Sequence, residues 1–176
     1  MAKPLKMSIV PFVHELGYDR SMPKTADADA SETGLRGSVL TDDLSFLLAR
    51  ANAIALAAGN SALGDHGLKA RSYSVLTLAA GEARPSQREL AEFLRLDPSQ
   101  VVSLVDDLQS RGLVERRPDP ADRRANVVVA TEAGRALAES ARESARAAEE
   151  RVHAALSGSE RETLTALLRR LAFPEA

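Results

Sequence analysis

The sequence lacks cysteine and tryptophan altogether, and aromatic residues make up only 3% of its 176 residues. Without cysteine the chain has no disulfide, no thiolate zinc site and no thiol-based redox switch. Its three histidines, His14, His66 and His153, have no metal-ligand spacing, so we expect no metal and no cofactor. Apolar runs fall short of the ~18 residues that span a bilayer, and no convincing signal peptide is present. We therefore expect a cytoplasmic protein with no membrane partner.

Catalytic motifs and an excess of positive charge are also missing. The sequence has no phosphate-binding loop, no nucleophile elbow and no paired carboxylates in a plausible cleft, so we do not expect an enzyme. The net charge is −2, from 23 basic and 25 acidic residues. Even the arginine-rich segment 84–124 holds eight arginines against eight acids. Charge alone therefore does not predict a nucleic-acid partner, and the placement of the arginines has to decide.

The residues that are present indicate a mainly helical domain. Apolar residues make up 44% and charged residues 27%, which is typical of a soluble globular protein. Apolar spacing predicts helices over 41–58, ended by Gly59 and Asn60, and over 69–80, closed by Gly81. Thr131 caps a long fifth helix, and a capping box of Ser159 and Glu162 opens a final one.

Residues 1–38 differ from the rest, because prolines and a polar tract interrupt them. We interpret them as a partly ordered N-terminal arm. The alternative is a short helix near the N-terminus whose apolar side chains pack on a partner subunit: Ile9, Phe12, Val13 and Leu16.

The segment 86–132 is the most informative. Ser86 and Glu89 form a capping box that opens a third helix. Asp97 is the N-cap of a fourth helix with Pro98 at its first position, and that helix runs to Arg111. Gly112 stops it. Two strands then follow over 113–117 and 125–130, joined by a turn rich in proline and aspartate.

This order places polar side chains where duplex DNA is read. Val101, Leu104, Val105 and Leu108 face inward on the fourth helix, which leaves its N-terminal residues outside. Candidate contacts to base edges in the major groove are Pro98, Ser99, Gln100 and Ser103. The alternative is an ordinary solvated helix face. The hairpin tip favours DNA, because an arginine enters a narrow minor groove readily and Asp122 is placed to orient Arg124. Arg116 and Arg123 complete the candidate DNA contacts.

At this point the sequence resembles the MarR family of winged helix-turn-helix regulators. The resemblance rests on DPSQVVSLVDDL at 97–108, RGLVERR at 111–117, DPADRR at 119–124 and TEAG at 131–134, in this order. It covers about residues 39–173. It implies six helices with a small β-hairpin wing, a DNA-binding lobe over 69–130, and a homodimer formed by helices within 39–59 and 131–173. Arg or Lys, common in the family at the positions of Ser103 and Asp107, is absent here, so we expect weaker and less salt-dependent DNA binding.

The resemblance also implies a small-molecule effector bound near the first, second and fifth helices. Candidate ligand contacts are Phe46, Arg50, His66, Arg71 and Tyr73, and Arg50 suits a carboxylate or phenolate. The alternative is that Phe46 and Tyr73 belong to the core and that His66 is a loop residue.

These observations predict a sequence-specific, DNA-binding transcriptional regulator. We expect a repressor that leaves a pseudo-palindromic operator when a small aromatic or lipophilic ligand binds. The alternative is a dimeric interaction module that uses the winged helix to contact protein, which the net charge of −2 and the exposed Asp106 and Asp107 suggest.

Overall fold

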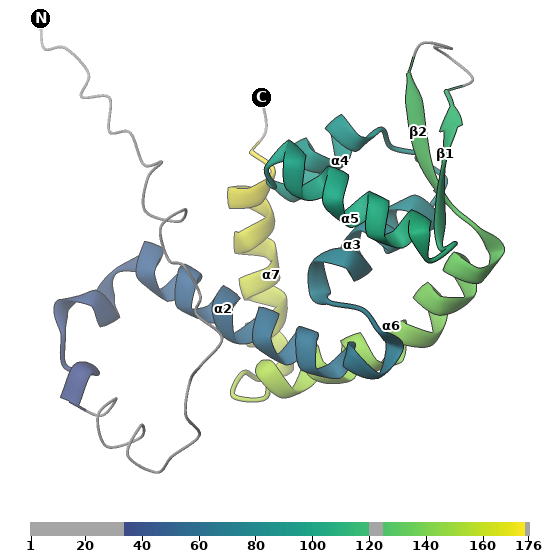
Figure 1. Ribbon diagram of the computed structural model, residues 1–176. Helices are drawn as coiled ribbons and strands as arrows, with labels where there is room; N and C mark the ends of the chain where they lie inside the picture. The colour runs from purple at the N-terminus through teal and green to yellow at the C-terminus, as the bar shows by residue number, and fades with distance from the viewer. Residues whose placement is uncertain (1–33, 120–124, 175–176) are drawn as a thin grey trace, which may run out of the picture. The chain divides into compact units, whose positions relative to one another are not determined.

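The computed structural model describes residues 34–119 and 125–174. Most of the predicted arm and the hairpin tip 120–124 therefore lie outside the described residues. The chain divides into two compact units, Met1–Ala53 and Ile54–Ala176. The described part of the first unit contains a short 3-10 helix, Val39–Asp42, and the beginning of helix α2. The second unit contains the helical domain and the hairpin (Figure 1).

Helix α2 spans Leu44–Ala62, and the predicted end at Gly59 and Asn60 is wrong. Asn60 stays helical, and its side-chain Oδ1 accepts the backbone N–H of Ala70 at 2.9 Å. Ala70 opens the next helix, so the asparagine satisfies a free helix-start N–H instead of ending its own helix. The chain turns after the end of α2, where Gly67 adopts φ +63°.

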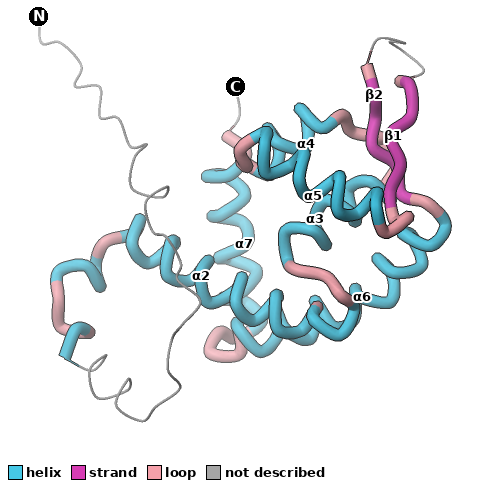
Figure 2. Tube along the Cα trace, in the orientation of Figure 1, coloured by secondary structure: helices cyan, strands magenta, loops and turns pink. Residues whose placement is uncertain are grey.

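The next three helices agree with the sequence prediction (Figure 2). Helix α3 spans Ala70–Ala80, α4 spans Gln87–Leu94 and α5 spans Pro98–Ser110. The Ser86–Glu89 capping box is formed: the Ser86 N–H donates to Glu89 at 2.7 Å, and this bond, with one from the Ser86 hydroxyl, holds the pKa of Glu89 below its ordinary value. The Asp97 carboxylate accepts the Ser99 N–H at 2.8 Å, so α5 begins where predicted.

The predicted hairpin is formed by β1, Val114–Pro118, and β2, Asn126–Ala130. The strands are antiparallel, with Val114 opposite Ala130 and Pro118 opposite Asn126. Gly112 links α5 to β1 at φ +67°. Its N–H donates to Gln109 O, and the Leu113 N–H donates to Leu108 O, both at 2.9 Å. This left-handed ending satisfies the last carbonyls of α5 and turns the chain directly into the hairpin.

Helix α6 spans Glu132–Val152 and is capped by Thr131 as predicted. Helix α7 spans Gly158–Ala172, and the predicted Ser159–Glu162 capping box is wrong. Ser157 and Glu160 form it instead, with the Ser157 N–H donating to Glu160 at 2.8 Å. The segment SGSERE offers two pairs at the same spacing, and the earlier pair lets the helix start two residues sooner. Hydrogen bonds from the hydroxyl and backbone N–H of Ser157 lower the pKa of Glu160.

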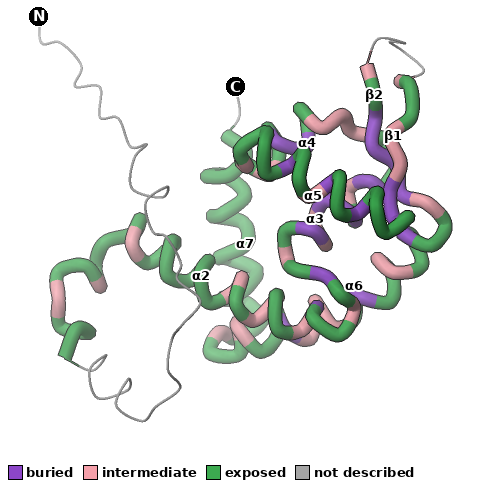
Figure 3. Tube along the Cα trace, viewed as in Figure 1, coloured by how far each residue is buried: buried purple, intermediate pink, exposed green. Residues whose placement is uncertain are grey.

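The core of the second unit lies between α3, α4, α5, the hairpin and α6 (Figure 3). Val75, Leu76, Leu90, Val101 and Val105 are almost completely buried in it. Helix α7 contrasts with the core, because none of its residues is buried. The described residues contain no helix long and apolar enough to cross a membrane.

Candidate DNA-binding surface

One face of α5 is buried and the opposite face is polar and exposed. Val101, Val105 and Leu108 are fully buried, as predicted, and Leu104 is half-buried. Pro98, Ser99, Gln100 and Ser103 are exposed at the N-terminal half of the helix. The Ser103 hydroxyl donates to Ser99 O at 3.0 Å, whereas the Gln100 side chain makes no hydrogen bond to the described residues. A free primary amide is the group that pairs with adenine through two hydrogen bonds.

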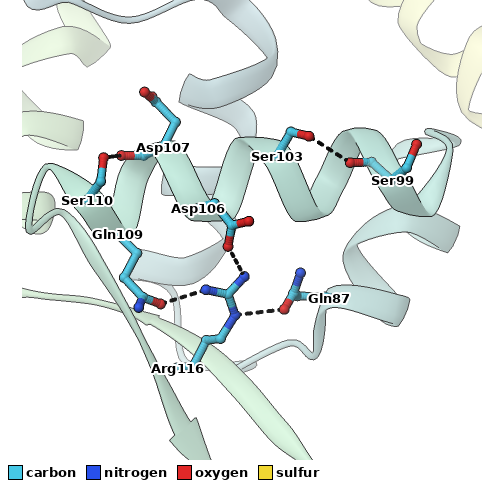
Figure 4. A network of polar contacts seen from close by, with 8 residues as sticks. All are labelled: Gln87, Ser99, Ser103, Asp106, Asp107, Gln109, Ser110 and Arg116. Atoms are coloured by element: carbon cyan, nitrogen blue, oxygen red, sulfur yellow. Dashed lines mark hydrogen bonds and ion pairs between the residues drawn. The ribbon is translucent and has the colours of Figure 1, made fainter.

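Arg116, on β1, joins the hairpin to both helices of the helix-turn-helix (Figure 4). Its Nε donates to Gln87 Oε1 at 2.8 Å, and one terminal nitrogen donates to Gln109 Oε1 at 2.7 Å. The other terminal nitrogen donates to the Asp106 carboxylate at 2.6 Å. The Arg116 side chain keeps only 25% of its accessible surface. Its donors are therefore largely engaged within the protein, and its first effect is to hold β1 against α4 and α5.

The acids of α5 are matched by arginines outside it. Asp106 pairs with Arg116, and Asp107 pairs with Arg111 at 3.3 Å. Helix α5 itself contains no lysine or arginine. The polar N-terminal half therefore lacks a cation of its own, but the two aspartates do not present uncompensated negative charge either.

Arg71, predicted to line an effector pocket, lies beside α5. It projects from the first turn of α3 and borders an open groove of about 340 Å³ with Ser99, Gln100, Ser103 and Leu104. The α3–α5 packing that brings these residues together is a tertiary contact. No local pattern in the sequence indicates this packing, so the sequence did not predict that Arg71 borders the start of α5.

The wing tip carries the other predicted DNA contacts. The described hairpin extends to Asp119, whose N–H donates to Ala125 O at 2.9 Å. Asp122, Arg123 and Arg124 lie outside the described residues, between these two ends. Arg117, near the tip on β1, pairs with Glu115.

Comparison with known proteins decides the family. A MarR-family transcriptional regulator from Rhodococcus sp. RHA1 is 41% identical, with a TM-score of 0.71 over 79% of this chain and 100% of that one. The chain belongs to the MarR family. The family's sequence profile matches residues 66–125. The crystal structure of CouR from Rhodococcus jostii RHA1 bound to p-coumaroyl-CoA is 42% identical, with a TM-score of 0.72 over 80% of this chain and 99% of that one.

A curated relative agrees with this assignment. The HTH-type transcriptional repressor NicR of Pseudomonas putida is 36% identical over 86 residues, 49% of this chain and 54% of that protein. The match therefore spans about half of NicR. As a member of the MarR family, the chain is a DNA-binding transcriptional regulator with the winged-helix fold. Proteins of this family act on DNA as dimers and respond to small molecules, which are the partners predicted here.

The predicted effector residues of this MarR-family chain are spread over several elements. Phe46 is half-buried in the first unit, which also holds Arg50. In the second unit, His66 Nε2 lies 3.0 Å from the Ser144 hydroxyl on α6, so it is a hydrogen-bonded residue. Tyr73 packs against the core. Arg71 borders the groove on α5. An effector site made by these five residues stays a prediction.

Proposed function

We propose that this MarR-family regulator is a homodimeric repressor of a pseudo-palindromic operator. The observation that carries the proposal is the exposed polar start of α5, held in a fixed relation to the hairpin by Arg116. Gln100, Ser99 and Ser103 would meet base edges in the major groove, with Pro98 beside them. The wing tip, with Arg124 oriented by Asp122 and preceded by Arg123, would enter the minor groove. In this proposal Arg116 does not contact DNA and instead holds the hairpin in position against α4 and α5.

The effector we propose is an aromatic acid or its coenzyme A thioester. CouR, 42% identical over 99% of its chain, was crystallised with p-coumaroyl-CoA. Binding of such a ligand would favour a dimer whose recognition helices no longer match successive major grooves, roughly 34 Å apart. In a mobility-shift assay on the promoter of the protein's own gene, the protein–DNA complex should disappear when p-coumaroyl-CoA is added. Coenzyme A alone is the control, and release by it at the same concentration would contradict an aromatic effector.

We infer no catalytic role, since the relatives are transcriptional regulators, and we place the protein in the cytoplasm, where its operator is. The sequence also suggested a protein-interaction module, because Asp106 and Asp107 are exposed on α5. Their pairing with Arg116 and Arg111 removes most of that reason. We propose the same division of the chain as before, with an arm over residues 1–38 and the winged-helix domain over 39–173.

Two substitutions test the division of labour on DNA. Gln100→Ala should reduce discrimination between operator and mutated operators, because each bidentate base contact contributes about 1–3 kcal/mol of selectivity. Arg124→Ala should weaken binding to operator and random duplex alike, because a minor-groove arginine reads shape and potential. Fluorescence anisotropy on the DNA upstream of the gene and on random duplex measures both. Equal losses of selectivity in the two variants would contradict the assignment.

A further inference from the structure

The groove beside α5 contains a cation that the proposed base contacts do not use. Arg71 is exposed and has no hydrogen bond or ion pair with the described residues. It shares the groove with Ser99, Gln100 and Ser103, the residues that start the recognition helix. An exposed arginine without an internal partner keeps all five N–H donors available to an external anion.

Two nearby arginines, Arg116 and Arg111, are engaged elsewhere. Arg116 donates to Asp106, Gln87 and Gln109, and Arg111 pairs with Asp107. Helix α5 contributes no lysine or arginine. Among the described residues that border this groove, Arg71 is the cation without a partner, and it comes from α3. Arginine and lysine contacts to phosphate supply much of the affinity of DNA-binding proteins, so this position matters for binding.

We propose that Arg71 is a phosphate clamp of the DNA-binding surface, which contacts the backbone next to the base pairs that Gln100 reads. The proposal rests on DNA binding by α5. The recognition helix has no Lys or Arg to contact phosphate, and the proposal assigns that contact to α3 instead. The groove is open, and Arg71, two hydroxyls, one amide and Leu104 border it, whereas sites for small molecules are enclosed. These properties favour the DNA backbone over the carboxylate of an effector.

The test measures how DNA affinity depends on salt. In a dimer, Arg71→Gln removes two phosphate contacts, so the slope of log K against log salt concentration should fall by about two. Affinity at about 0.1 M salt should drop at least tenfold on both the upstream promoter duplex and a random duplex, which leaves the ratio of the two unchanged. Arg71→Lys should restore most of the affinity, because a phosphate accepts an ammonium group as well.

Arg142→Gln is the matched control. It removes the same charge from an exposed arginine on α6, whose ion pair with Glu139 is long, at 3.7 Å. It should leave the affinity and the salt slope unchanged. The melting temperature of Arg71→Gln should equal that of the wild type, because Arg71 has no partner among the described residues.

Four outcomes would overturn the proposal. Arg71→Gln could bind both duplexes like the wild type, or it could need more p-coumaroyl-CoA for release, which would make Arg71 an effector residue. If Arg71→Lys binds as poorly as Arg71→Gln, the contact is not a simple phosphate contact. If the wild type itself binds neither duplex at low salt, both the proposed DNA binding and the proposed phosphate contact of Arg71 are wrong. In the first three outcomes DNA binding by α5 still stands.

Discussion

Gly134, near the start of α6, shows how strictly one residue position can be constrained. A Cβ built there would lie 1.9 Å from the carbonyl oxygen of Leu113, at the base of the hairpin. Thr131 contacts the same place, since its N–H donates to Leu113 O at 3.0 Å and its hydroxyl to Gly112 O at 2.7 Å. The motif TEAG therefore sets the contact by which α6 supports the hairpin.

Gly134→Ala should lower the free energy of unfolding by about 3 kcal/mol, because backbone atoms have to move to admit the methyl group. Urea denaturation monitored by circular dichroism measures the change. Gly158→Ala, at the start of α7, is the control, because no atom of the described residues lies within 4 Å of the position that its methyl group would take. If the two variants unfold at the same urea concentration, the close approach of Gly134 does not constrain the fold.

Single residues also mark where sequence reasoning succeeds and where it stops. Asp97 and Thr131 cap helices where predicted, because a cap depends on the residues that follow it directly. Asn60 does not end its helix, and the sequence could not show this because its hydrogen-bond partner, Ala70, is ten residues away. Arg71 could not be placed beside α5 for the same reason, since its neighbours there come from another part of the chain.

At the scale of elements, Arg116 fixes the relation between the hairpin and the recognition helix. Arg116→Ala removes three hydrogen bonds from a mostly buried side chain. One of them is the hydrogen bond to Gln87 Oε1, and Gln87 Nε2 already has no partner among the described residues. We expect a loss of about 1–2 kcal/mol in unfolding free energy, because Asp106 is itself exposed and its ion pair is screened.

DNA binding by Arg116→Ala should weaken while the salt slope stays that of the wild type, because Arg116 positions the hairpin without a phosphate contact of its own. Isothermal titrations at several salt concentrations test this. Glu92→Gln is the control: its ion pair with Arg88 is fully on the surface, so neither stability nor affinity should change. A fall in the salt slope of Arg116→Ala would instead make Arg116 a direct DNA contact.

The order of the elements was predictable and their mutual contacts were not. Capping residues, Gly112 and the alternation of β1 and β2 are local signals, and they predicted the helix-turn-helix and the hairpin. The contact between these elements depends on the hydrogen bonds that Arg116 donates to Gln87, Gln109 and Asp106. Nothing in the sequence around these three polar residues indicates that they share a partner.

On the scale of the whole molecule, α7 carries exposed leucines that we propose to lie in the homodimer interface. Its exposed leucines include Leu164, Leu167 and Leu171, with 39%, 49% and 63% of their surface accessible. Leucines on one helix that find no cover within the described chain are typical of an interface between subunits.

Leu167→Glu should raise the dissociation constant of the dimer at least a hundredfold, because the interface would bury an unpaired carboxylate from each subunit. Analytical ultracentrifugation measures the change, and binding to a palindromic operator should be lost with the dimer. Val102→Glu changes an exposed apolar residue on α5 and should remain dimeric. A dimeric Leu167→Glu protein would place the interface elsewhere.

A recognition helix without lysine or arginine also bears on how a regulator finds its site in a genome. Binding to arbitrary sequence depends almost wholly on cations, and it withdraws most copies of a regulator from circulation. A surface with Arg71 as its uncommitted cation in the groove and with Gln100 to read bases loses few molecules to the bulk of the chromosome. We therefore expect such a regulator to occupy its operator at a lower copy number than one whose recognition helix carries lysine or arginine.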